Sequence, residues 1–373
     1  MHSRGRFSFT SLIVLFLLSF QAESALTMHV FEQSNALIAS NNSQKPVLEM
    51  HIFTRPSKEQ RNGVVPNYKK SRAEHTVKPA LKYQRTEVYF KTGYRHDDLH
   101  WSIAAVSGTP NIVSELTWQD IEIATISSGA TVHIQDNWLV NFDIVYGHVF
   151  DGKNQDSDYY GNNRTLEFSR SNNGADEGDV LDLSAAVGYR WKVPFNQHSP
   201  FPQIDLIPQV GLSYYSQNLK MVDGRQTLSD YGFGMPLGRF PNLNTTYDAT
   251  WFGPWLGLKS QFIFNHDFKL GVSFEYHHAF YDATANWNLR SDFAHPESYI
   301  QEAEGYGLVS NIEGQLQLDT NLALNVTLNY QDWQAVRQGV NQFFFADGST
   351  VKSKYNGVNW RSFSANLGLI YEF

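Results

Sequence analysis

Asp156 and Asp158, separated by one residue in a polar stretch, form the grouping in this sequence that is best placed to do chemistry. Such a pair is usually just hydrated, although its oxygens could help to hold a hard cation such as Ca²⁺, which needs several oxygen ligands. Further side-chain oxygens follow, without a recognisable spacing, at Asn162, Asn163, Asp176 and Glu177. The residues alone therefore predict neither a metal site nor a cofactor.

Composition excludes or disfavours other kinds of chemistry. The chain has no cysteine, which rules out thiol catalysis and cysteine-ligated metals. It has no phosphate-binding loop and no His-Glu-x-x-His zinc motif. The formal net charge of −8 disfavours a nucleic-acid partner, because nucleic acids are bound mainly through basic side chains.

The elements that must position these residues are strands with one apolar face. At the end of the chain, Phe363, Leu367, Leu369, Tyr371 and Phe373 alternate with polar or small residues. Successive side chains of a strand point to opposite faces, so one face meets an apolar medium and the other a polar one. Similar alternating runs follow one another from Thr86 onward, near residues 86–103, 114–134, 138–150, 180–191, 206–220, 251–264, 268–281, 306–318, 322–336 and 359–373. This pattern is typical of a transmembrane β-barrel.

The connections between the runs also alternate in length. Residues 135–137, 265–267 and 319–321 are predicted to be tight turns, whereas 151–179, 222–250, 283–305 and 337–358 are predicted to be long polar loops. Outer-membrane barrels have short periplasmic turns and longer extracellular loops. The sequence therefore predicts an all-β fold, a ten-stranded antiparallel transmembrane β-barrel over residues 86–373, in the bacterial outer membrane. Its long loops should be extracellular and both chain termini periplasmic.

The inward-facing positions of this barrel are predicted to be small or polar. A narrow barrel either fills its interior with such side chains or leaves a thin aqueous path, and the sequence leaves both open. Aromatic residues near strand ends, including Trp138, Trp191, Trp251, Tyr330 and Phe373, fit the aromatic girdles of membrane barrels. The residues predicted to line the lumen are Asp143, Asp182, Arg190, Glu275, Glu313, Asn325 and Asn366.

Two segments precede the predicted barrel. Residues 1–25 combine Arg4 and Arg6 with an apolar run and a small-residue site near Ser24, which predicts a secretory signal peptide. Residues 26–85 hold ten Lys and Arg against four Glu and show no sustained period, which predicts a basic, disordered periplasmic arm. The arm is either a hydrated linker or a segment that docks on an acidic periplasmic partner, for which the mouth of the barrel is one candidate.

Two local runs carry a resemblance to a known family. They are Ser114-Glu115-Leu116-Thr117-Trp118 and Asp156-Ser157-Asp158-Tyr159. Together with the C-terminal strand and the ten-strand layout, they make residues 86–373 similar to the omptins, which are ten-stranded outer-membrane endopeptidases. The chain also resembles the omptin-like major outer-membrane proteins of chlamydia-like bacteria, some of which are regarded as pores.

The omptin resemblance implies a specific catalytic arrangement. In that family, an acidic pair faces an Asp and a His on the fourth outer loop, and a water held between them attacks the peptide bond. Asp156 and Asp158 match the acidic pair, but the Asp and His positions fall on Asn286 and Asn288. Because an asparagine amide cannot act as the general base, the expected base is missing. His295, with Asp292 three residues before it, is the candidate replacement.

These observations lead to an expected function with two alternatives. We expect a non-peptidase barrel that acts as a narrow pore or a major structural surface protein, surrounded by outer-membrane lipid and lipopolysaccharide. The first alternative is an omptin-type endopeptidase that uses Asp156, Asp158 and His295. The second is a surface adhesin that binds through its long aromatic loops.

Overall fold

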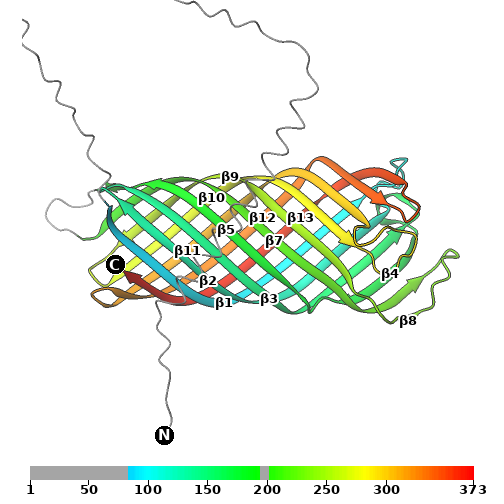
Figure 1. Ribbon diagram of the computed structural model, residues 1–373, viewed down its shortest axis with the longest axis horizontal. Coiled ribbons are helices and arrows are strands. Elements are labelled where there is room, and N and C mark those ends of the chain that lie inside the picture. The colour runs from blue at the N-terminus through cyan, green and yellow to red at the C-terminus, as the bar shows by residue number, and fades with distance from the viewer. Residues whose placement is uncertain (1–82, 194–200) are drawn as a thin grey trace, which may run out of the picture. The chain divides into compact units, whose positions relative to one another are not determined.

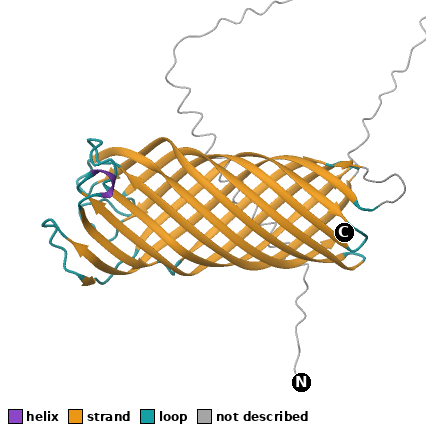
Figure 2. Cartoon of the chain, turned by 180° about the vertical axis from the view of Figure 1, so that it is seen from behind, coloured by secondary structure: helices purple, strands orange, loops and turns teal. Residues whose placement is uncertain are grey.

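The computed structural model describes residues 83–193 and 201–373, and nearly all of them lie in one antiparallel sheet that closes on itself (Figure 1; Figure 2). The expected signal peptide and residues 26–82 of the expected arm lie outside the described residues. The strands are β1 (Tyr83–Ile103), β2 (Ser114–Ile134), β3 (Trp138–Tyr159), β4 (Glu167–Gly174), β5 (Gly178–Tyr189), β6 (Trp191–Val193), β7 (Gln203–Ser229), β8 (Gly238–Arg239), β9 (Thr245–Ile263), β10 (Phe268–Asn286), β11 (Tyr299–Asp319), β12 (Leu322–Phe344) and β13 (Thr350–Glu372). One 3₁₀ turn, η1 (Asn162–Arg164), connects β3 to β4.

The sheet closes because its first and last strands pair with each other. Glu87 of β1 lies opposite Glu372 of β13, and β1 also pairs with β2. The segments β4, β5 and β6 follow one another in a single strand position of the ring, which we call a wall, between β3 and β7. β8 is a short strand that pairs with the end of β7. The ring therefore has ten walls, and the predicted ten-stranded barrel is confirmed.

The predicted alternation on the C-terminal strand, β13, is confirmed by side-chain exposure. Phe363, Leu367 and Leu369 are 45–51% exposed, whereas Ser362 and Ser364 are buried inside the barrel. The exposed apolar residues of neighbouring strands continue this surface, which we call the apolar band. Burying such a surface in hydrocarbon is favourable, and ring closure leaves no unpaired strand edge in the lipid.

The strands are longer and the loops shorter than the sequence predicted. β3 continues to Tyr159 and the chain returns as β4, so that much of the predicted loop 151–179 is strand. β7 has 27 residues and β9 has 19, whereas about 9–11 residues cross a bilayer. Outward-facing residues become polar beyond the apolar band, and a polar stretch in the sequence looks the same whether it is strand or loop. Each wall therefore extends past the apolar band at the end that carries the longer connections, which we call the loop end.

The start of the barrel also differs slightly from the prediction. β1 begins at Tyr83, so Arg85 belongs to the wall and not to the arm. Its guanidinium pairs with Glu87 at 2.8 Å and with Glu372 at 3.3 Å, which ties the first strand to the last. Phe373 lies at the end of the barrel opposite to β4 and β8 (Figure 1). We call the end that carries Phe373 the turn end. No helix among the described residues is long and apolar enough to cross a membrane.

A close backbone contact between two walls depends on glycine. A Cβ atom added at Gly253 of β9 would lie 1.8 Å from the carbonyl oxygen of His278 in β10. We expect Gly253→Ala to lower the free energy of unfolding by about 1–3 kcal/mol, because the strand must move to relieve the clash. Urea unfolding of the barrel refolded in lipid vesicles measures this. Gly314→Ala is the matched control, because a Cβ there meets open space, and an equal loss in both variants would contradict the prediction.

Candidate functional site

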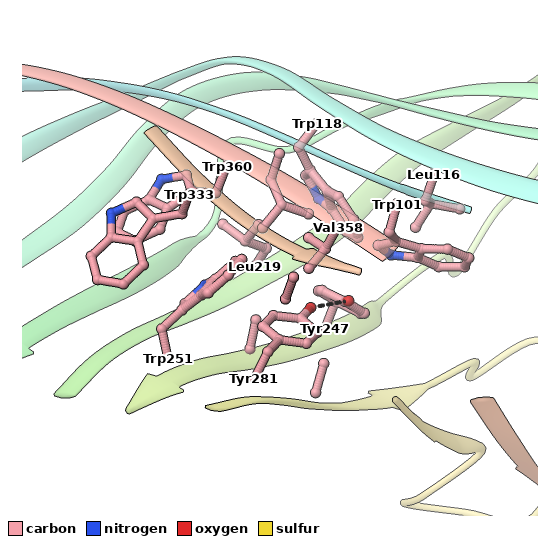
Figure 3. Packing of buried hydrophobic residues seen from close by; sticks show 14 of the residues in the cluster. Trp101, Leu116, Trp118, Leu219, Tyr247, Trp251, Tyr281, Trp333, Val358 and Trp360 are labelled. Carbon is pink, nitrogen blue, oxygen red and sulfur yellow. Dashed lines mark hydrogen bonds between the residues drawn. The ribbon is translucent and has the colours of Figure 1, made fainter. Parts of the chain in front are cut away.

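An aromatic layer fills the loop half of the barrel interior (Figure 3). Trp251, Trp333 and Trp360 are at its centre, with ring centroids 5.5–5.8 Å apart. All three are at most 1% exposed. Trp251, predicted as a girdle residue on the outer surface, therefore points inward; Trp138, Trp191, Tyr330 and Phe373 are exposed. The layer comprises Trp101, Trp118, Tyr215, Tyr247, Trp251, Tyr281, Tyr299, Trp333, Tyr355 and Trp360.

A buried charge cluster lies next to this layer. The guanidinium of Arg95 donates hydrogen bonds to Asp182 at 2.8 Å and to both carboxylate oxygens of Asp97 at 2.6 and 2.8 Å. The indole N–H of Trp360 donates to Asp97 at 3.0 Å, and the Arg95 guanidinium lies 5.2 Å from the Trp360 ring. The three charged side chains are 2–7% exposed. The cluster therefore joins β1, β5 and β13 across the lumen.

The turn half of the interior contains a polar cavity of about 290 Å³. Its acidic lining residues include Asp143, Glu275 and Glu313, and its basic ones include Lys91 and Lys259. Lys259 pairs with Glu313 at 2.7 Å, and Asp143 accepts a hydrogen bond from the Tyr89 hydroxyl. The ion pair to Glu313 and the hydrogen bond to Asp143 each compensate a carboxylate inside the barrel, as a low-dielectric interior requires.

The structure places the residues predicted to line the lumen at several depths. Asp143, Asp182, Glu275, Glu313 and Asn366 surround the cavity. Asn325 is fully buried and its amide donates to Glu313 at 2.8 Å. Arg190 lies 3.5 Å from Asp205, near the turn end. His277 is fully buried inside, 3.1 Å from Glu275 and 2.9 Å from the Ser213 hydroxyl.

Asp156 and Asp158 lie on the inward face of β3, opposite Leu116 and Ser114 of β2. The apolar band ends on β3 at Phe150, so both carboxyl groups lie beyond it toward the loop end. Burial, followed by the charge of Asp158, raises the pKa of Asp156, and burial also raises the pKa of Asp158. The charge of Arg290 opposes both shifts. The pair thus faces a cation from the loop that follows β10.

The residues of that loop do not assemble a base next to the pair. The side-chain oxygen Oδ1 of Asn288 accepts a hydrogen bond from the backbone N–H of Asn244 at 2.9 Å, which holds two loops together. The side-chain oxygen Oδ1 of Asn286 lies 2.7 Å from Nδ1 of His295, and Nε2 of His295 lies 3.2 Å from the backbone carbonyl oxygen of Arg290. The two imidazole nitrogens of His295 therefore face oxygens from the end of β10 and from the loop that follows it.

The Asp292 and His295 dyad considered from the sequence does not form. Asp292 instead pairs with Arg290 at 2.7 Å. Among the described residues, no hydrogen bond or ion pair joins His295 to Asp156 or Asp158. A general base must lie within hydrogen-bond reach of the water that it activates, and both nitrogens of His295 instead lie against the Asn286 and Arg290 oxygens.

Comparison with known proteins identifies a family and a fold. The family described as Pom, Protochlamydia outer membrane protein, matches residues 89–373. The outer membrane protease OmpT from Escherichia coli is similar in structure, with a TM-score of 0.65 and 15% sequence identity, covering 79% of this chain and 99% of that chain. The outer membrane protein OprG from Pseudomonas aeruginosa has a TM-score of 0.30 and 10% identity, covering 79% and 97%. No curated protein matches the sequence. The predicted omptin-like family and fold are confirmed.

Proposed function

The chain belongs to the family of Protochlamydia outer membrane proteins, and from this premise we propose that it is a non-peptidase structural barrel whose lumen is closed by the aromatic layer. It lies in the bacterial outer membrane, surrounded by lipid and lipopolysaccharide. In this proposal the loop end is extracellular, and the turn end, with both chain termini, is periplasmic. That orientation follows the usual arrangement of short periplasmic turns and longer extracellular loops.

The observation that carries the proposal is the packing of the aromatic layer. Trp118, Trp251 and Trp360 have no exposed surface, and Trp333 is 1% exposed, which supports a layer that excludes water. Their side chains come from β2, β9, β12 and β13, so the layer is held from several sides of the ring. Close-packed interiors of this kind have few voids larger than a water molecule.

Solute permeability tests the closed lumen. Liposomes that contain the refolded full chain should swell in an isotonic sugar solution no faster than protein-free liposomes. A general diffusion porin in parallel liposomes is the positive control. Swelling at a rate similar to the porin's would overturn the proposal.

The polar cavity favours a second candidate, a narrow pore that opens when the aromatic layer moves. A barrel that served only as a filled support would not need a cavity of about 290 Å³ lined by charged side chains. In this reading the cavity is the periplasmic part of a path for small solutes, and the aromatic layer is the gate. Swelling that appears only under an applied perturbation, such as a membrane potential, would favour this candidate.

Peptide cleavage is expected to be absent. His295, the candidate base among the described residues, is held by Asn286 and the Arg290 carbonyl and makes no hydrogen bond to the acidic pair. We expect the refolded protein to cleave a mixture of synthetic peptides no faster than Asp156→Ala or His295→Ala, as followed by mass spectrometry. Cleavage by the wild type that both substitutions abolish would establish the peptidase alternative.

A further inference from the structure

A group of possible metal ligands lies on the outer face of the barrel, away from the lumen. His96 and Asp98 of β1 point outward, two residues apart, as alternate residues of a strand do. Asp120 of β2 points to the same place. Among the described residues, this is the only group of three or more His, Cys, Asp and Glu side chains whose ligand atoms all lie within 4.8 Å of one another.

Two bulges in the sheet bring Asp120 to this position. Trp118 and Ile121 are both buried inside the barrel although they are three residues apart, which strict alternation does not allow. The register therefore shifts by one residue between β1 and β2 at Asp98, and again between β2 and β3. Asp120 is the extra residue and has a positive φ of 53°. Bulges re-aim side chains in this way, and here they turn Asp120 outward beside His96.

Each carboxylate has one oxygen held and one oxygen left for a ligand. Oδ1 of Asp98 accepts a hydrogen bond from the backbone N–H of Asp120 at 3.0 Å, and Oδ2 of Asp120 accepts one from Lys153 at 3.0 Å. Oδ2 of Asp98 lies 3.9 Å from Nε2 of His96, and Oδ1 of Asp120 lies 4.0 Å from the same nitrogen. Outer hydrogen bonds of this type orient the ligands of metal sites.

The ligand atoms lie somewhat farther apart than a bound transition ion requires. Two ligand atoms of a tetrahedral zinc ion, each about 2.1 Å from the metal, are about 3.4 Å apart. Both His96 distances exceed this value by about half an ångström, and all three ligand atoms lie within 4.8 Å of one another, so small side-chain rotations can bring them together around an ion. Imidazole with carboxylates suits zinc or a similar divalent ion, whereas calcium prefers a larger set of oxygens.

The geometry points to a divalent transition-metal site formed by His96, Asp98 and Asp120 on the outer wall of the barrel. It lies at the loop-end edge of the apolar band, because Tyr94 is the last exposed apolar residue before His96 on β1 and Phe363 of the band lies opposite His96 on β13. The three side chains are 34–56% exposed, so an ion can enter from solvent and keep water on its remaining positions.

Calorimetric titration of the refolded full chain with zinc, after chelator treatment, tests this site. We expect saturable zinc binding, and we expect His96→Ala or Asp120→Asn to weaken the affinity at least about tenfold. Loss of an outer-shell hydrogen-bond partner already lowers metal affinity by about this factor, and loss of a ligand itself should lower it at least as much. A calcium titration under the same conditions should show no comparable binding. Urea unfolding of the two variants verifies that they fold.

The matched control is Asp151→Asn, which removes an exposed outward carboxylate on the neighbouring strand without touching His96. Zinc binding in this variant should equal that of the wild type. If Asp151→Asn weakens zinc binding as much as Asp120→Asn, the ion is held by diffuse negative charge and the proposal fails. It also fails if His96→Ala binds zinc as tightly as the wild type, or if the wild type shows no saturable binding.

Discussion

Arg95→Met is expected to lower the free energy of unfolding of the barrel by about 3–5 kcal/mol. Arg95 is the only partner that compensates the charges of Asp97 and Asp182 among the ion pairs of the described residues. Removing it leaves two carboxylates buried in the barrel without a counter-charge, and a buried unpaired charge costs more than the lost attraction alone. Denaturant unfolding from lipid vesicles measures the effect.

Two further variants separate this explanation from a general effect of losing an arginine. Arg95→Met combined with Asp97→Asn and Asp182→Asn should recover most of the loss, because no charge then remains unpaired. Arg361→Met is the matched control, since Arg361 is 68% exposed and lies 3.9 Å from Asp332, and it should cost less than about 1 kcal/mol. Equal destabilisation in Arg95→Met and in the triple variant would contradict the account.

Removing two tryptophans from the aromatic layer is expected to open the lumen. Trp251 and Trp333 lie 5.7 Å apart by ring centroid and come from walls on different sides of the interior. Trp251→Ala with Trp333→Ala should let small sugars enter liposomes that the wild type leaves closed. Each substitution should also lower the free energy of unfolding by about 3–5 kcal/mol, because neighbouring side chains only partly occupy the space that the tryptophan leaves.

Trp138→Ala controls for the loss of an aromatic residue outside the lumen, because Trp138 is 47% exposed on the outer surface. Its liposomes should remain closed. The backbone ladder that closes the ring is unchanged in all these variants, so the barrel itself should persist. A double variant that is folded and still excludes sugars would show that the layer is not the barrier.

The ten walls and the outward apolar face could be predicted because they follow from a period of two along the chain. The C-terminal strand is the clearest case, since Phe363, Leu367 and Leu369 alternate with small or polar residues and do face outward. The ends of the strands could not be predicted, because outward residues beyond the apolar band are polar both in a strand and in a loop. Residues 151–159 show this directly.

Which residues meet inside the barrel could not be predicted from the sequence either. Alternation assigns Trp251 and Trp360 to one face of a strand but does not reveal that aromatic rings from separate walls meet. The Arg95 cluster was missed because its partner Asp182 is 87 residues away along the chain. For the acidic pair, the omptin resemblance implied that the expected Asp and His positions fall on Asn286 and Asn288, and in the structure His295 is bonded to other groups.

The most direct test of the closed lumen is the single-channel conductance of the refolded full chain in a planar lipid bilayer. If the aromatic layer blocks the lumen, the wild type should give no unitary current steps, whereas Trp251→Ala with Trp333→Ala should give them. Reproducible steps of one size from the wild type would contradict the account and establish a pore.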